Sequence, residues 1–230
     1  MPAHAADPTP SERALREGIV AAARRLDALG LNRGTSGNVS VRFGAGLLIT
    51  PSGMPSDAMG PDDIVPLDAD GAPSGPLRPS SEWRFHRDIL RARPEIGAVV
   101  HAHPDHATAF AICGQDIPAV HYMIAAAGGP TIRCAPYATF GTAELSARAV
   151  AALEGRSACL LANHGMIATG PTLDRALWLA AEVETLCRQY AAALAVGRPV
   201  VLPDDEIARV VALFADYGPR ARTDASTAVD

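Results

Sequence analysis

The segment 96–103, with the sequence IGAVVHAH, constrains the fold of this chain more than any other feature. Its apolar run has the length of a buried strand, and Pro104 follows it, where a helix over 105–113 is expected to start. Residues two apart on a strand project from the same face, so His101 and His103 can reach one metal ion together. The sequence therefore predicts a buried strand that ends in a pair of imidazoles.

The remaining pattern predicts a single α/β domain over residues 1–230, with flexible tails at 1–10 and 219–230. Strands are expected at 39–43 and 47–50, joined as a hairpin, and at 64–67, 131–134 and 158–162. Helices are expected at 12–29, at 80–92 with Ser80 or Ser81 as the cap, and at 142–154, 172–196 and 204–215. Because strands arrive in hairpins as well as after helices, we expect a central mixed or mainly antiparallel sheet flanked by helices on both faces.

The composition excludes several kinds of enzyme. All 20 basic residues are Arg, and the sequence contains no Lys. Schiff-base aldolases, pyridoxal-phosphate enzymes and Walker A nucleotidases each need a Lys amine. Any carbon–carbon chemistry must therefore use a metal or another cofactor.

Charge and hydropathy indicate where such a chain works. A net charge of -5 without a basic block argues against a nucleic-acid partner. No apolar stretch is long enough for a membrane span, and the N-terminus lacks the apolar core of a signal peptide, so a cytoplasmic location is expected. The four widely spaced cysteines are expected to be core thiols, with Cys113 and Cys159 in apolar runs.

Two further residues extend the histidine pair to a candidate metal site. His164 follows the apolar segment 158–162, and Glu82 stands at the start of the helix expected at 80–92. Three imidazoles and a carboxylate suit Zn²⁺. The pair alone is also compatible with two surface histidines, but His164 at an equivalent strand end favours a metal. His86, one turn after Glu82, is expected to pack against or support the ligands.

Three segments rich in Gly, Ser and Thr suggest an anion site built from neutral donors. They are Gly34–Asn38, Thr50–Gly53 and the pair Ser80-Ser81 at a helix N-terminus. Each alone is typical of an ordinary turn or helix cap. Together, in a chain without Lys, they suggest an anion such as phosphate held by neutral donors, with Thr35 and Asn38 adding side-chain donors.

Seven segments in order resemble the L-fuculose-1-phosphate aldolases of the class II aldolase/adducin superfamily, over residues 12–220. They are GTSGNVSVR, LITPSGMP, PSSEWRFH, VVHAHPDHATA, HYMIAAAGG, CAPYATFGT and the NHG around His164. The resemblance implies zinc bound by Glu82, His101, His103 and His164, with Glu82 leaving the ion to exchange a proton. It also implies a phosphate site, because Gly37, Asn38, Ser52, Gly53, Ser80 and Ser81 match the family's phosphate-binding positions. It implies cleavage of a ketose 1-phosphate into dihydroxyacetone phosphate and a short aldehyde such as L-lactaldehyde.

The same resemblance implies a homotetramer with four-fold symmetry. Tyr122 and Tyr217 match catalytic tyrosines contributed by a neighbouring subunit, and Phe140 and Phe214 match aromatic residues at the entrance. Departures from the family pattern are mild: Ser52 replaces a familiar Thr, Asn163 stands before the metal His in place of a longer polar residue, and Pro219 follows Tyr217. The last two are expected to affect aldehyde preference.

Three other functions compete with this interpretation. The same chemistry on 5-deoxyribulose 1-phosphate or 5-methylthioribulose 1-phosphate, in a salvage pathway, would use the same metal and phosphate residues. A ribulose-phosphate 4-epimerase is disfavoured because its pattern has Asp where this chain has Glu82. An adducin-like binding module is disfavoured by the intact set of metal ligands.

Overall fold

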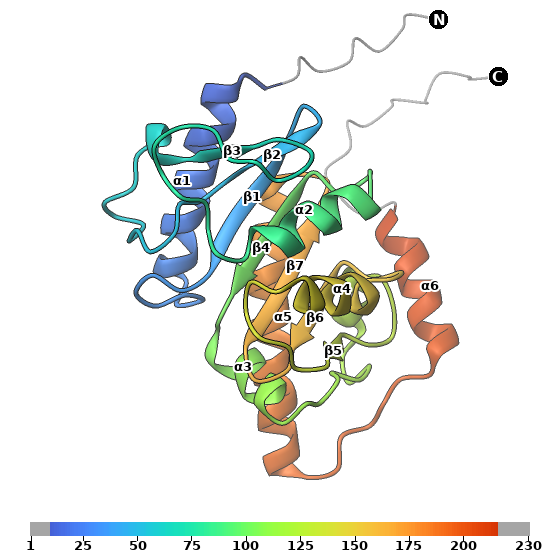
Figure 1. Cartoon of the computed structure of the whole chain (residues 1–230). Coiled ribbons are helices and arrows are strands. Elements are labelled where there is room, and N and C mark those ends of the chain that lie inside the picture. The colour runs from blue at the N-terminus through green and yellow to red at the C-terminus, as the bar shows by residue number, and fades with distance from the viewer. Residues whose placement is uncertain (1–9, 216–230) are drawn as a thin grey trace, which may run out of the picture.

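A seven-stranded sheet in the order β3-β2-β1-β4-β7-β6-β5 crosses the centre of the molecule, with helices on both faces (Figure 1). The computed structural model describes residues 10–215. The strands are β1 Asn38–Phe43, β2 Gly46–Ile49, β3 Val65–Leu67, β4 Ala98–Ala102, β5 Arg133–Ala135, β6 Ala158–Leu161 and β7 Gly165–Gly170. All neighbours pair antiparallel except β5 and β6. The predicted single α/β domain with a mainly antiparallel sheet is confirmed.

The helices enclose two apolar layers. They are α1 Glu12–Ala28, α2 Trp83–Ala92, α3 Asp105–Ile112, α4 Ala143–Ala152, α5 Leu173–Val196 and α6 Asp204–Ala215, with short 3-10 helices η1 Pro61–Asp63 and η2 Tyr122–Ala127. Side chains alternate along β4: Val100 packs in the layer with α1, α3 and α5, and Val99 packs in the layer with α2 and α4. His101 projects on the same side as Val99, so its ring enters the layer under α2.

The start of α2 differs from the prediction that Ser80 or Ser81 caps it. Glu82 is the N-cap residue and makes no side-chain capping bond. Residues 80–83 first form a turn, in which the Trp83 N–H donates to the Ser80 carbonyl at 3.1 Å and the Glu82 N–H to the Ser80 hydroxyl at 3.3 Å. The helix therefore begins later, and this turn leaves the Glu82 carboxylate at its N-terminus.

Three smaller expectations were also wrong. Strand β7 was missed because Gly165, Ala168 and Gly170 dilute its apolar character. The strand expected at 131–134 is displaced to Arg133–Ala135, where it pairs with β6. Cys113 is exposed because it lies at the C-terminal end of α3, whereas Cys159 and Cys187 are buried as expected.

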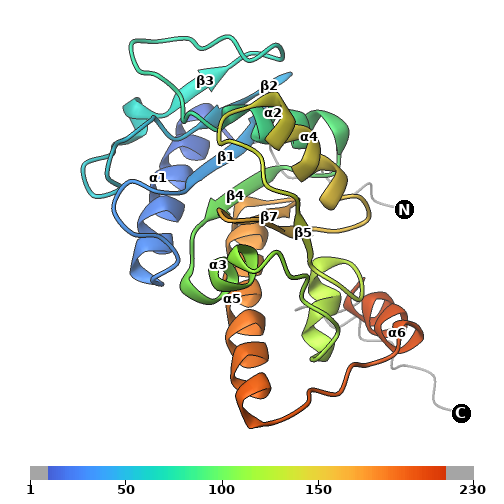
Figure 2. The same ribbon diagram turned by 60° about the horizontal axis from the view of Figure 1, so that its bottom comes forward.

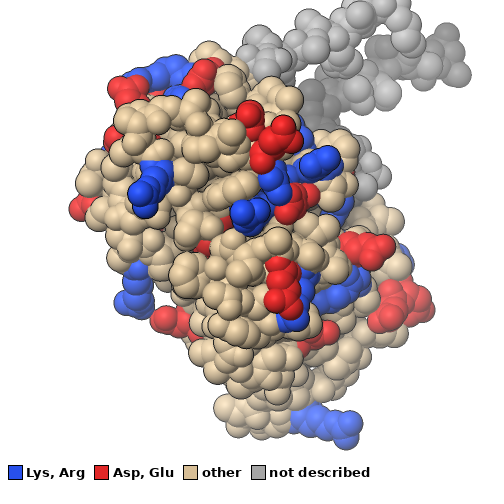
Figure 3. Space-filling view, viewed as in Figure 1, with Lys and Arg blue, Asp and Glu red and all other residues tan. Residues whose placement is uncertain are grey.

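The outer helices and surface complete the fold. Figure 2 shows α5 running well past the sheet and α6 lying beside η2, which it contacts. Within residues 10–215, no helix combines the length and the apolar character that a membrane span requires. On the face drawn in Figure 3, basic and acidic side chains are interspersed.

The turn between β6 and β7 carries backbone strain. Asn163 has a φ of 55°, the one positive value recorded for a non-glycine residue in the described part of the chain. Its backbone N–H donates to the Ala111 carbonyl at 3.0 Å, and its side-chain amide to the Ile112 carbonyl at 3.4 Å. Asn tolerates this left-handed conformation better than most residues. The turn thereby holds the next residue, His164, at the end of β6.

We predict that Asn163→Val lowers the free energy of unfolding by about 1–3 kcal/mol, because a β-branched residue resists positive φ. Asn163→Gly should cost much less, since glycine adopts this conformation without strain. Urea denaturation of the two variants and the parent protein measures the difference. A Val variant as stable as the Gly variant would show that the turn does not need positive φ.

Candidate active site

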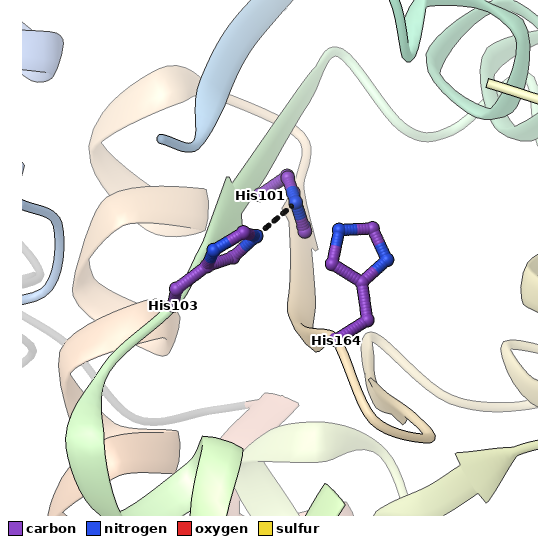
Figure 4. A group of neighbouring side chains, drawn as sticks. All are labelled: His101, His103 and His164. Atoms are coloured by element: carbon purple, nitrogen blue, oxygen red, sulfur yellow. Dashed lines mark hydrogen bonds between the residues drawn. The ribbon is translucent and has the colours of Figure 1, made fainter. Parts of the chain in front are cut away.

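Three imidazoles converge at the end of β4 (Figure 4). His101 lies in β4, His103 directly follows the strand, and His164 comes from the β6–β7 turn. The His101 and His103 Nε2 atoms are 2.8 Å apart, and nitrogen atoms from all three rings lie within 4.8 Å of one another. Pairing of β4 with β7, which sets His101 opposite Ile167, brings these distant parts of the chain together.

Glu82 joins the three rings from the N-terminus of α2. Its Oε2 lies 3.1 Å from His101 Nε2, and its Oε1 lies 3.2 Å from His164 Nε2. The side chain is buried, yet Oε1 makes no hydrogen bond. A buried carboxylate oxygen without a donor needs a positive partner. Three imidazole nitrogens and this oxygen therefore fit a divalent cation.

The orientation of the His101 ring is fixed by its second nitrogen. His101 Nδ1 donates to the Met166 carbonyl on β7 at 2.9 Å. This leaves Nε2 as the atom that faces Glu82 and His103. Metal-binding histidines are commonly oriented in this way by a bond to the other nitrogen.

The same contacts determine the charges of the site without metal. Burial alone would lower the pKa of His101, but the Glu82 carboxylate raises it above the ordinary 6.5. Burial alone would raise the pKa of Glu82, but His101 and His164 hold it well below its usual range. Burial and the neighbouring His101 and His164 lower the pKa of His103 to about 3. Below the raised pKa of His101, the metal-free site thus holds an ionised Glu82 beside a protonated His101, and His103 stays neutral down to about its own lowered pKa.

We predict that a divalent metal displaces the proton of His101 Nε2 when it binds at pH 6. Because the pKa of His101 is raised, the imidazolium is populated below that pKa, and metal affinity should fall as the pH falls through it. Calorimetric titration of metal-free protein with Zn²⁺, in two buffers of different ionisation enthalpy, measures the proton release. Equal heats in both buffers would contradict this charge assignment. The control is His101→Ala, which lacks the imidazole that releases the proton.

A cavity of about 370 Å³ opens beside the histidine cluster. All seven residues predicted for the phosphate site line it, together with Glu82, His103 and His164. The other lining residues are Ser36, Pro51, Tyr137, Ala138, Phe140 and Asn163. The three candidate phosphate segments and three of the four candidate metal ligands therefore line one space, while His101 is buried behind it.

The loop at 34–37 packs against Asn32, which the sequence did not single out. Gly37 has a φ of 76°, and a Cβ there would lie 2.3 Å from the Asn32 amide nitrogen. Asn32 Oδ1 accepts the backbone N–H of His103 at 3.2 Å. This buried amide connects the glycine loop to the residue that follows β4. It stands in an unremarkable polar turn, so no local pattern marks it.

The aromatic candidates are distributed differently. Phe140 lines the cavity and is 64% exposed, and Tyr137, missed although it lies in one of the quoted segments, lines it as well. Tyr122 and Phe214 are not among the lining residues, and Tyr122 is 51% exposed. Tyr217 lies outside the described residues. Of the three predicted aromatic residues that lie within residues 10–215, only Phe140 lines the cavity of its own chain.

The fold and the cluster define a class of protein. Residues 17–191 match the family described as Class II Aldolase and Adducin N-terminal domain, and the chain belongs to this family. It is a class II aldolase, a metal-dependent lyase. This confirms the family and enzyme class expected from the sequence.

The similar proteins of known name are named for different substrates. A Rhodospirillum rubrum protein named 5-methylthioribulose-1-phosphate/5-deoxyribulose-1-phosphate aldolase is 57% identical over 212 residues, which are 92% of this chain and 96% of the relative. The L-fuculose phosphate aldolase of Escherichia coli strain K12 is 51% identical over 203 residues, which are 88% and 94% of the two chains. A solved L-fuculose 1-phosphate aldolase has a TM-score of 0.86 and 39% identity, and the match covers 90% of this chain and 98% of that one.

Proposed function

We propose that this enzyme uses Zn²⁺ to cleave a ketose 1-phosphate, reversibly, into dihydroxyacetone phosphate and a short aldehyde. The observation that carries the proposal is the shared cavity, which is lined by three of the four candidate metal ligands and by three segments of neutral anion donors. The names of the relatives agree with phosphorylated ketoses as substrates. L-Fuculose 1-phosphate, which would give L-lactaldehyde, is the first candidate substrate. The Rhodospirillum rubrum relative favours 5-deoxyribulose 1-phosphate and 5-methylthioribulose 1-phosphate as the second.

The phosphate would be bound without a Lys, by the loops that hold Gly37, Asn38, Ser52 and Gly53 and by the serines at the start of α2. Backbone N–H groups, hydroxyls and the positive end of a helix dipole all favour an anion. Anchoring the phosphate at a distance from the bond to be cleaved provides binding energy that positions the ketose.

The proposed reaction requires proton transfer at two atoms of the substrate, the reacting carbon and the hydroxyl on the aldehyde side. Zn²⁺ at the cluster would act as the Lewis acid that stabilises negative charge next to the ketone. Glu82, ionised and at the edge of the cavity, would take the proton from the reacting carbon in the synthesis direction and return it in cleavage. Tyr122 of a neighbouring subunit would exchange the proton of the aldehyde-side hydroxyl.

Steady-state kinetics on a panel of ketose 1-phosphates, with and without a chelator, tests the function. We expect cleavage of at least one of L-fuculose 1-phosphate, 5-deoxyribulose 1-phosphate and 5-methylthioribulose 1-phosphate, loss of cleavage on chelation, and recovery with Zn²⁺. The ranking of kcat/KM identifies the physiological aldehyde class. No cleavage of any member by the zinc-loaded enzyme would refute the proposal.

For Glu82→Gln we predict a fall in kcat of roughly two to four orders of magnitude, because the variant retains size but cannot carry the proton. Zinc content should be retained, since three histidines remain. Metal analysis and kinetics on the same preparation separate the two effects. Near-normal turnover in the zinc-loaded variant would assign the proton transfer to another group.

We propose further that the enzyme is a homotetramer with four-fold symmetry and that its sites lie at subunit interfaces. Tyr122 is half-exposed at the start of η2, stacked on His121, and does not reach the cavity of its own chain. Head-to-tail contacts that close into a ring would allow η2 of one subunit to cover the cavity of the next. Phe214, and Tyr217 beyond the described residues, would belong to the same contact.

Mixing two inactive variants tests this arrangement. If His101→Ala and Tyr122→Phe subunits are dissociated and reassembled together, some interfaces combine an intact metal cluster with an intact Tyr122, so activity should partly return. Each variant reassembled alone is the matched control. A mixture as inactive as its parents, or an active enzyme that sediments as a monomer, would contradict the interface site.

A further inference from the structure

A line of buried polar side chains runs through the apolar layer between the sheet and α2. Asn38 and Ser40 are two residues apart on β1 and project on the same face, where Asn38 lies opposite His101. His86 lies one turn after Glu82 on α2. Ser40 and His86 are both 0% exposed. Apolar side chains would fill this space at lower cost, so the polar groups need a reason.

These side chains form one continuous set of hydrogen bonds that ends at Glu82. Ser40 Oγ is 2.7 Å from His86 Nδ1, His86 Nε2 contacts Asn38 Oδ1, and Asn38 Nδ2 donates to Glu82 Oε2 at 3.0 Å. His86 also stacks on Phe85, with ring centroids 4.7 Å apart. Stacking alone would not require both ring nitrogens to be bonded.

The direction of each bond follows from the Asn38 amide, whose Nδ2 faces Glu82 Oε2 and whose Oδ1 faces His86 Nε2. The NH₂ group only donates and the amide oxygen only accepts, so His86 Nε2 must carry a proton. Burial and the nearby His101 lower the pKa of His86 to about 3, so the ring is neutral and Nδ1 accepts the Ser40 hydroxyl proton.

We propose that His86 is a positioning residue, which holds the Asn38 amide in the one orientation that serves the reaction. An Asn38 amide held this way gives one N–H to Glu82 and directs the other donor of its NH₂ group to the cavity that Asn38 lines. A reversed amide would set its oxygen against the Glu82 carboxylate and present an acceptor to an anionic substrate. The proposal rests on the ketose-phosphate function for its kinetic consequence, but not for the bonding pattern.

The bonding pattern is tested by ¹⁵N NMR of the histidine rings, in the metal-free and the zinc-loaded protein without substrate. We expect His86 to be neutral with its proton on Nε2 in both forms. In Ser40→Ala, Nδ1 loses its donor, and the ¹⁵N shift of that atom should move. A proton on Nδ1 in the parent protein would overturn the proposal, whatever the substrate proves to be.

The kinetic consequence is tested by a double-mutant cycle between His86 and Asn38. His86→Leu should raise KM for the ketose 1-phosphate roughly 10- to 100-fold, the loss expected for a misdirected bond to a charged group. His86→Gln, which retains an N–H near the Nε2 position, should restore KM to within about threefold. In an Asn38→Ala background, the His86 substitutions should change KM little.

Thr169→Val is the matched control, because it removes a hydrogen bond of another buried polar residue. Thr169 Oγ1 donates to the Ser157 carbonyl at 2.9 Å, near the end of β7 that lies away from His164. The substitution should lower stability and leave KM unchanged. A positioning role would be refuted if the His86 and Asn38 substitutions changed KM additively. It would also be refuted if the folded His86→Gln and His86→Leu variants had equal KM values. If His86→Leu does not fold, the Gln variant and its cycle with Asn38→Ala decide the question.

Discussion

The pairing of β4 with its two neighbours is the constraint on which the site depends. Strand β4 carries His101, its pairing with β7 brings the turn that holds His164, and its pairing with β1 sets Asn38 directly opposite His101. Because β4 is buried on both faces, its register is fixed by which side chains enter which apolar layer. A slip of one residue would turn His101 into the layer under α1 and α5, away from Glu82. The same apolar pattern thus specifies the fold and assembles the cluster.

The sequence predicted the parts of this molecule that have a local pattern. The apolar strand before His101 and His103, the equivalent strand before His164 and the three donor segments were all visible, and the structure places them around one cavity. The sequence did not reveal Asn32, Tyr137 or β7, and it left the partners of His86 open. Asn32 acts on His103 across 71 positions, and His86 on Asn38 across 48. Such contacts depend on tertiary packing, which neither spacing nor composition encodes.

The layer under α2 combines two opposing requirements. It contains Phe85, Ile49 and Val99, and it also contains ionisable Glu82, His86 and His101, all buried. Each of these polar groups loses its hydrating water on burial and must replace it with hydrogen bonds inside the protein. The series of hydrogen bonds that runs from Ser40 through His86 and Asn38 to Glu82, and the bond from His101 to Met166, replace this lost hydration. Glu82 Oε1 is the one atom of these side chains left without a hydrogen bond. A bound cation would satisfy that oxygen, so metal occupancy and folding stability should be linked in this enzyme.

The two halves of the proposed substrate meet parts of the protein with different mechanical properties. The phosphate half would contact loops tied to the sheet, such as Gly37 against Asn32 and Ser80 in its turn before α2. The aldehyde half would face exposed aromatic side chains, Tyr137 and Phe140, and the neighbouring subunit's Tyr122. Exposed side chains can change size without disturbing a packed core, whereas the tied loops cannot. The proposed metal and phosphate site would therefore serve several aldehydes, which would account for the different substrate names of relatives with 57% and 51% identity.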